Sequence, residues 1–120
     1  MDAYNVFKIA VPDSRVREFL TKNGWENAGK DREMEMDSYR SKKTGGRICV
    51  EDISDDFPVT FLIGELSQSE FGRMARVLSP EVRLMEVESS WEGEPTTIVV
   101  SMTEAQVKDM FGRRTKMRPL

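Results

Sequence analysis

The sequence predicts an α+β fold, in which one domain has an antiparallel or mixed sheet with helices packed on it. A chain of 120 residues has the length of one ordinary domain. Its apolar residues alternate in some segments, as in strands, and recur every three or four residues in others, as in helices. The resulting order is β-α-β-β-β-α-β-β-α. Helices alternate with hairpins rather than with single strands, which argues against a doubly wound parallel sheet.

The first predicted strand covers residues 4–11 and ends at Pro12. Asp13 or Ser14 is expected to cap the helix that follows, because a short side-chain oxygen can accept a hydrogen bond from the free amides of the first turn. Gly24 is the expected stop of this helix, since glycine reaches positive φ at little cost. Three residues at helical spacing form its apolar face: Val16, Phe19 and Leu20.

Residues 32–41 and 48–50 are predicted to form a hairpin, and residues 59–63 the next strand. In the first segment methionines alternate with acidic residues, which is typical of a strand with one apolar face. The pair Gly45-Gly46 is suited to a two-residue primed turn between the two strands.

The second half of the chain contains two capping boxes, in which a hydroxyl side chain caps an amide and the residue three positions later reaches back. Ser67 and Glu70 form the first box, and Thr103 and Gln106 form the second. Each box precedes an apolar stripe at helical spacing. Two strands are predicted between these helices, at residues 82–91 and 96–101.

Composition excludes several kinds of catalytic site. The chain has no histidine, so Ser-His-Asp and Cys-His catalysis and histidine-containing zinc sites are ruled out. Its one cysteine, Cys49, lies between apolar residues and is expected to be a small buried side chain. No cofactor or metal is expected. No apolar run has the length of a membrane helix and the N-terminus does not resemble a secretory signal, so a cytoplasmic location is expected.

Charge divides the chain into an acidic body and a basic tail. The domain is expected to span residues 1–112, followed by a flexible basic tail at residues 113–120. Four of the 18 cationic residues lie in that tail, so residues 1–111 hold 14 cationic and 21 acidic residues, a formal charge of −7. An acidic body favours basic protein partners and disfavours nucleic acid, which only the tail would bind, and weakly.

The leading hypothesis is therefore a small non-enzymatic accessory protein that binds a basic macromolecule through an acidic surface. It would be an inhibitor, an immunity-type protein or a phage-encoded regulatory module. Acidic residues are expected to share strand faces, and Trp91 beside a turn is expected to be an exposed anchor. The acidic residues of the predicted binding surface are Glu33, Glu35, Asp37, Glu86 and Glu88.

An alternative is a binder of nucleotides or other phosphorylated ligands. The hairpin loop combines cations with glycines whose amides can approach a phosphate closely, although it lacks the P-loop spacing. A symmetric homodimer would close such a site. The residues involved are Lys42, Lys43, Thr44, Gly45, Gly46 and Arg47, with Arg113 and Arg114 from the tail.

A third hypothesis is an enzyme that uses carboxylates and a divalent metal. Acidic residues crowd residues 51–56, and carboxylates can hold Mg²⁺ or Ca²⁺. The segment lacks the spacing of a calcium loop, so this hypothesis ranks below the two binding functions.

Overall fold

The structure is a computed structural model that describes residues 4–91 and 93–120. Three helices and eight strands follow one another along the chain. They are β1 (Asn5–Ile9), α1 (Asp13–Lys22), β2 (Trp25–Asp31), β3 (Met36–Ser41), β4 (Arg47–Asp52), β5 (Thr60–Gly64), α2 (Gln68–Leu78), β6 (Leu84–Trp91), β7 (Glu94–Ser101), α3 (Glu104–Phe111) and β8 (Met117–Pro119).

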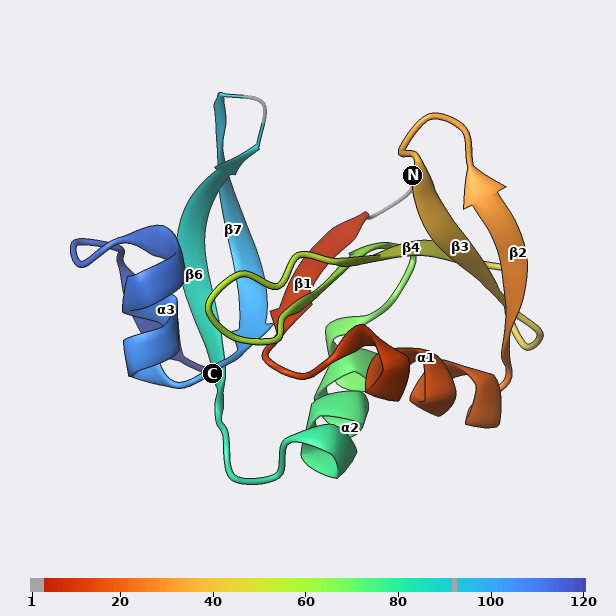
Figure 1. The fold of residues 1–120 in the computed structure, drawn as a ribbon, viewed down its shortest axis with the longest axis horizontal. Helices are drawn as coiled ribbons and strands as arrows, with labels where there is room; N and C mark the ends of the chain where they lie inside the picture. Colours follow the sequence, from red (N-terminus) through yellow and green to blue (C-terminus); the bar gives the residue numbers. More distant parts are fainter. Residues whose placement is uncertain (1–3, 92) are drawn as a thin grey trace.

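All eight strands join in one mixed sheet, in the order β2-β3-β4-β5-β1-β7-β6-β8. Only β1 and β7 run parallel to each other; the other neighbours are antiparallel. Figure 1 shows α1 and α2 below the sheet and α3 beside the β6–β7 hairpin. The predicted α+β class and the predicted order of elements are confirmed, with two strands, β2 and β8, in addition.

Strand β2 was not predicted, because its residues do not alternate between apolar and polar. Trp25 is its one buried residue, and those that follow are exposed or half-buried. The strand forms an edge of the sheet, and its pairing with β3 shifts in register between Asn27 and Gly29. An edge strand with one neighbour and a bulge has little apolar surface to bury, so the period of two is absent.

The end of the chain, expected to be a flexible tail, instead contributes β8 at the opposite edge of the sheet. Met117, Arg118 and Pro119 pair with β6, and the amide of Leu120 donates to the carbonyl of Leu84 (3.1 Å). Met117 packs against the apolar cluster around α3. The basic composition of these residues gave no sign of a strand. Strand β8 forms because β6, which lies much earlier in the chain, offers it a free edge.

The helix starts are only partly as predicted. Thr103 and Gln106 form both arms of the second capping box. Ser67 accepts from the amide of Glu70, but the carboxylate of Glu70 accepts from the Ser67 hydroxyl. The first helix has no side-chain cap: Pro12 occupies the N-cap position.

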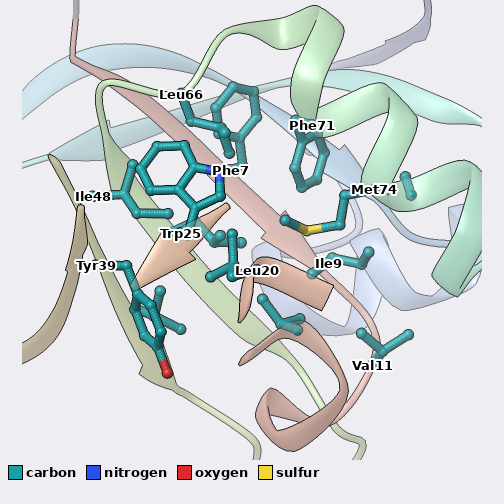
Figure 2. Packing of buried hydrophobic residues seen from close by; sticks show 14 of the residues in the cluster. Phe7, Ile9, Val11, Leu20, Trp25, Tyr39, Ile48, Leu66, Phe71 and Met74 are labelled. Atoms are coloured by element: carbon teal, nitrogen blue, oxygen red, sulfur yellow. The ribbon is translucent and has the colours of Figure 1, made fainter. Parts of the chain in front are cut away.

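The main core fills the space between the sheet and helices α1 and α2 (Figure 2). Phe7 of β1 and Phe71 of α2 are fully buried there and stack with ring centroids 4.3 Å apart. Trp25 and Leu20 belong to the same cluster, which closes the end of α1 against the first residue of β2. These contacts hold two helices to the centre of the sheet.

A second cluster lies on the other face of the sheet. Along β7, Val99 belongs to the main core, whereas Ile98 and Val100 pack with Val107 of α3. Successive residues of a strand point to opposite faces, so α3 and the pair α1 and α2 lie on opposite faces. The short helix α3 leaves part of the sheet face on which it lies uncovered.

The uncovered part is formed by β3, β4, β5 and the start of β1. Met36, Cys49 and Phe61 make a small buried cluster there. In the part of the chain that the structure describes, the apolar side chains packed against this cluster come from strands and loops, and none comes from a helix. A sheet face that has apolar residues and no helix over it is a candidate binding surface.

Candidate functional site

A groove of about 440 Å³ lies on this uncovered face. Its floor includes Val6, Cys49 and Ile63, which are neighbours across three adjacent strands because Cys49 and Val6 both pair with Ile63. Met34 and Tyr4 add apolar surface at its sides, and the ring of Tyr4 is largely exposed. The groove therefore has an apolar floor made by regular strands, which are rigid elements.

Two acidic side chains form one rim, one from the last residue of β2 and one from the turn between β2 and β3. An oxygen of Asp31 accepts hydrogen bonds from the amides of Glu33 and Met34, both at 2.9 Å, and Glu35 closes the turn with a φ of 57°. Asp31 and Glu33 both line the groove. Within residues 4–91 and 93–120 neither carboxylate has an ion pair, so no cation of the described chain neutralises them.

Arg47 of β4 supplies a positive charge to the same groove. The pKa of the Cys49 thiol beside it is raised, mainly because burial disfavours the thiolate and further because Asp31 is close, while Arg47 acts in the opposite direction. The arrangement is unsuited to a nucleophilic cysteine, which needs a lowered pKa. The same arrangement is compatible with a groove that binds a ligand without reacting with it.

Cys49 is expected to react slowly with iodoacetamide near pH 8.5, where about half of a free thiol is ionised. Its rate should keep rising at more alkaline pH, because the folded protein holds the thiol proton more tightly than the unfolded chain does. Mass spectrometry of the alkylated protein over a pH series measures this. The same chain in urea is the control and should follow an ordinary thiol curve; coincident curves would contradict the raised pKa.

The acidic residues predicted to share strand faces do not form one surface. Glu33 and Glu35 were assigned to a strand, but residues 32–35 form the turn described above. The alternation of methionines and acids was misread because an aspartate-based turn, not a strand, sets the spacing. Asp37 lies on β3 and Glu86 and Glu88 on β6, and four strands separate β3 from β6.

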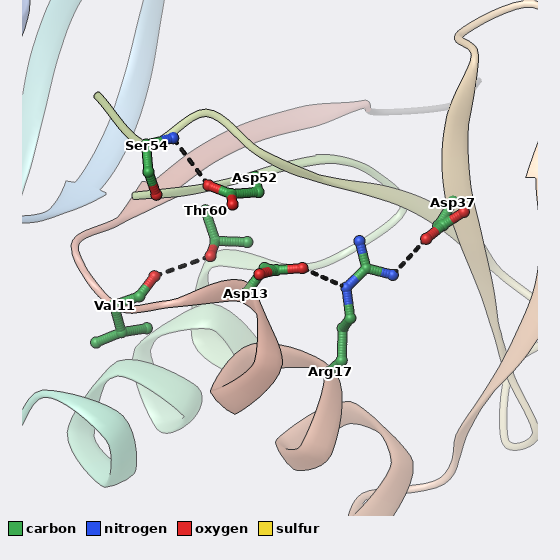
Figure 3. A network of polar contacts seen from close by, with 7 residues as sticks. All are labelled: Val11, Asp13, Arg17, Asp37, Asp52, Ser54 and Thr60. Carbon is green, nitrogen blue, oxygen red and sulfur yellow. Dashed lines mark hydrogen bonds and ion pairs between the residues drawn. The ribbon is translucent and has the colours of Figure 1, made fainter. Parts of the chain in front are cut away.

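Two of these acids are neutralised within the fold. Asp37 accepts from Arg17 at 2.6 Å, and Arg17 also binds Asp13 at 2.8 Å, which ties α1 to β3 (Figure 3). Burial opposes the charge of Arg17, but its hydrogen bonds with Asp13 and other neighbours outweigh burial and raise its pKa. Glu86 accepts from Arg118 of β8 at 2.6 Å.

Glu88 is exposed, and its amide donates to the carbonyl of Lys116. It shares a hollow of about 320 Å³ with Glu86 and the chain end that carries Lys116 and Arg118. This part of the predicted acidic surface is thus faced by cations of the same chain. The side chain of Trp91, the predicted anchor, lies outside the described part of the structure.

The loop predicted to hold phosphate has no free amide in the structure. Each of its six backbone N–H groups donates a hydrogen bond within the protein. The amide of Lys42 donates to the carbonyl of Gly24, and the amides of Lys43, Thr44 and Gly45 donate to oxygens of Ser41. The amide of Gly46 donates to the Thr44 hydroxyl, and that of Arg47 donates to the Glu65 carboxylate. The loop is also longer than a two-residue turn, since Arg40 pairs with Arg47. A phosphate would find only side-chain donors there.

Arg113 and Arg114 are not brought to this loop. They follow α3, which packs against β6 and β7, whereas the loop joins β3 to β4 nearer the opposite edge of the sheet.

The acidic residues of segment 51–56 do not gather around one point. Asp52 accepts from the amide of Ser54, and Asp55 and Asp56 line a separate hollow. Among the described residues no group of three or more histidine, cysteine or acidic side chains could hold a metal ion.

Glu33 and Arg47 were predicted from the sequence as binding residues, whereas the other residues that line the groove were not. Asp31 carried a local signal, because an aspartate side chain can accept hydrogen bonds from the amides two and three residues later and so favours a turn. Val6, Ile63 and Thr96 carried none, since their proximity depends on strand pairing.

Comparison with protein-family models, with curated proteins and with solved structures finds no match to this chain. None of the helices in the described part of the chain combines the length and the apolar character that crossing a membrane requires.

Proposed function

We propose that this protein is a non-catalytic binding module that takes an extended, basic and apolar segment of a protein partner in the groove over β1, β4 and β5. The observation that supports this most directly is an apolar floor next to two carboxylates without ion pairs in the described chain. Apolar contact provides affinity, and complementary charge provides selectivity and speed of association.

The shape and chemistry of the groove favour an extended segment. Its floor consists of side chains from the neighbouring strands β1, β5 and β4, and an extended segment laid across them would contact all three strands. An apolar side chain would rest on Cys49 and Ile63, while a lysine or arginine beside it would face Asp31 and Glu33. The Arg47 guanidinium has several N–H donors that can bind a main-chain carbonyl of such a segment.

This version of acidic recognition differs from a broad acidic face. Asp37 and Glu86 are already paired within the protein, so the carboxylates that the groove itself offers to a partner are those of Asp31 and Glu33. Phosphorylated ligands are the weaker candidate, because the loop amides that would cradle a phosphate are engaged.

The test uses a short peptide of alternating lysine and leucine, with a glutamate and leucine peptide as its counterpart. We expect the basic peptide alone to shift the amide resonances of Val6, Cys49 and Ile63, to slow alkylation of Cys49, and to bind more weakly as salt rises. The double change Asp31→Asn and Glu33→Gln should weaken binding about tenfold, since each charge pair contributes up to about 1 kcal/mol. Asparagine keeps the side-chain acceptor that the turn requires.

The matched control is the double change Glu18→Gln and Glu81→Gln, which removes two exposed acids that do not line the groove: Glu18 lies on α1, on the opposite face of the sheet, and Glu81 lies between α2 and β6. It should bind the peptide as the original protein does. Ile63→Gln removes apolar floor without changing charge and should also weaken binding. Equal affinity in the groove and control variants, or shifts confined to residues elsewhere, would overturn the proposal.

A further inference from the structure

Lys8 of β1 is a half-buried lysine in an unusual environment. Its amino nitrogen lies 4.6 Å from the ring centroid of Phe111 and 5.9 Å from that of Phe61. No carboxylate of residues 4–91 and 93–120 forms an ion pair with it. Taking a cation out of water without an anionic partner is costly, and aromatic rings offset only part of that cost.

Two hollows reach this side chain. One, of about 240 Å³, is lined by Lys8 together with Asp55, Asp56 and Asp109. The other, of about 50 Å³, is lined by Lys8 with Val6 and Thr96, which also line the groove described above. The amine is therefore accessible to a small molecule from the larger hollow.

We propose that Lys8 is a nucleophilic amine that forms an imine with small, neutral carbonyl compounds entering the hollow lined by Asp55, Asp56 and Asp109. The three carboxylates set the class of compound: they repel anionic carbonyl compounds and leave neutral ones unaffected. The apolar side chains of Phe57 and Met110 line the same hollow and suit a short alkyl chain.

The chemistry balances without a further reactant. The nitrogen lone pair attacks the carbonyl carbon, the C=O π electrons move to oxygen, and one proton passes from nitrogen to that oxygen to give a carbinolamine. Loss of water then forms the C=N bond. Solvent water entering the hollow can accept and return the protons.

Burial lowers the pKa of the Lys8 amine. At neutral pH a larger fraction of Lys8 is therefore uncharged than of an exposed lysine. The acidic groups that face the hollow, Asp55 and Asp56 from the loop before β5 and Asp109 from α3, favour the charged amine, but burial is the effect that sets the direction of the pKa shift. None of them forms an ion pair with it in the structure.

The experiment treats the whole protein with propanal and cyanoborohydride, which reduces an imine to a stable secondary amine, and maps each lysine by mass spectrometry. Lys8 is expected to be labelled several times faster than exposed Lys43 at neutral pH, with the difference shrinking in alkaline solution. Lys8→Arg keeps the cation beside the rings and should fold normally without a label at this position. Labelling of Lys8 at or below the rate of Lys43 throughout the pH range would overturn the proposal.

A second arm tests the role of the carboxylates. Glyoxylate, an anionic aldehyde of similar size, should label Lys8 much more slowly than propanal does, and the triple change Asp55→Asn, Asp56→Asn and Asp109→Asn should remove this preference. Equal labelling by both aldehydes in the original protein would contradict the proposed selectivity. The inference is independent of peptide binding in the groove.

Discussion

Phe71→Ala is expected to destabilise the protein by about 4 kcal/mol, because truncating a fully buried phenylalanine leaves a cavity and removes an aromatic stack. Phe71 is the residue through which α2 contacts Phe7 in the middle of the sheet (Figure 2). Since domains are stable by only about 5–15 kcal/mol, this single change would use a large share of the total. Urea unfolding followed by the fluorescence of buried Trp25 measures it.

Two further variants separate the causes. Phe71→Leu keeps most of the volume but loses the ring and is expected to cost about 1.5 kcal/mol. Val77→Ala, on the same helix but exposed, should change the free energy of unfolding by less than about 0.5 kcal/mol. If Phe71→Ala were no worse than Val77→Ala, the packing of α2 on the sheet would be wrong.

Gly64→Ala is expected to cost about 3 kcal/mol or more. Gly64 has a φ of 140°, in the region that side chains avoid, and this strain alone costs about 1–3 kcal/mol. An added Cβ would also collide with the carbonyl oxygen of Arg47 and lie 2.8 Å from the Cα of Ile48. Because β4 is held between β3 and β5, its backbone cannot move away without breaking hydrogen bonds on both sides.

Gly72→Ala is the matched control for this change. Gly72 lies inside α2, and an added Cβ would make an ordinary 3.5 Å contact with Leu84. Alanine favours helix, so this variant should gain about 0.5–1 kcal/mol. Opposite signs for the two glycines in thermal or urea unfolding are the expected result. Similar destabilisation in both would show that the close approach of β4 and β5 is not as described.

Local sequence signals were accurate where the hydrogen bonds are local. The capping box of Thr103 and Gln106 joins residues three apart, and both of its bonds are present. The same kind of signal failed at α1, where Asp13 binds Arg17 instead of capping the helix. A side chain with two competing partners in reach cannot be assigned from spacing alone.

The candidate site was less accessible to sequence reasoning than the fold. Glu33 and Arg47 attracted attention through their charge, yet each was placed in a different predicted site. Asp37 and Glu86 were counted as exposed charge, although Arg17 and Arg118 neutralise them from segments 20 and 32 residues away. Pairings of this range leave no mark in composition or periodicity.

The sequence by itself determined the fold class, the order of nine elements and the absence of histidine chemistry, because these depend on composition and on contacts within a few residues. Only the tertiary structure decided that the two sheet edges are β2 and β8, that α3 leaves part of its face open, and that Val6, Cys49 and Ile63 meet under two acidic side chains. Those outcomes depend on strand pairing between distant segments, and the free energy of that pairing belongs to the assembled sheet rather than to any one segment of the chain.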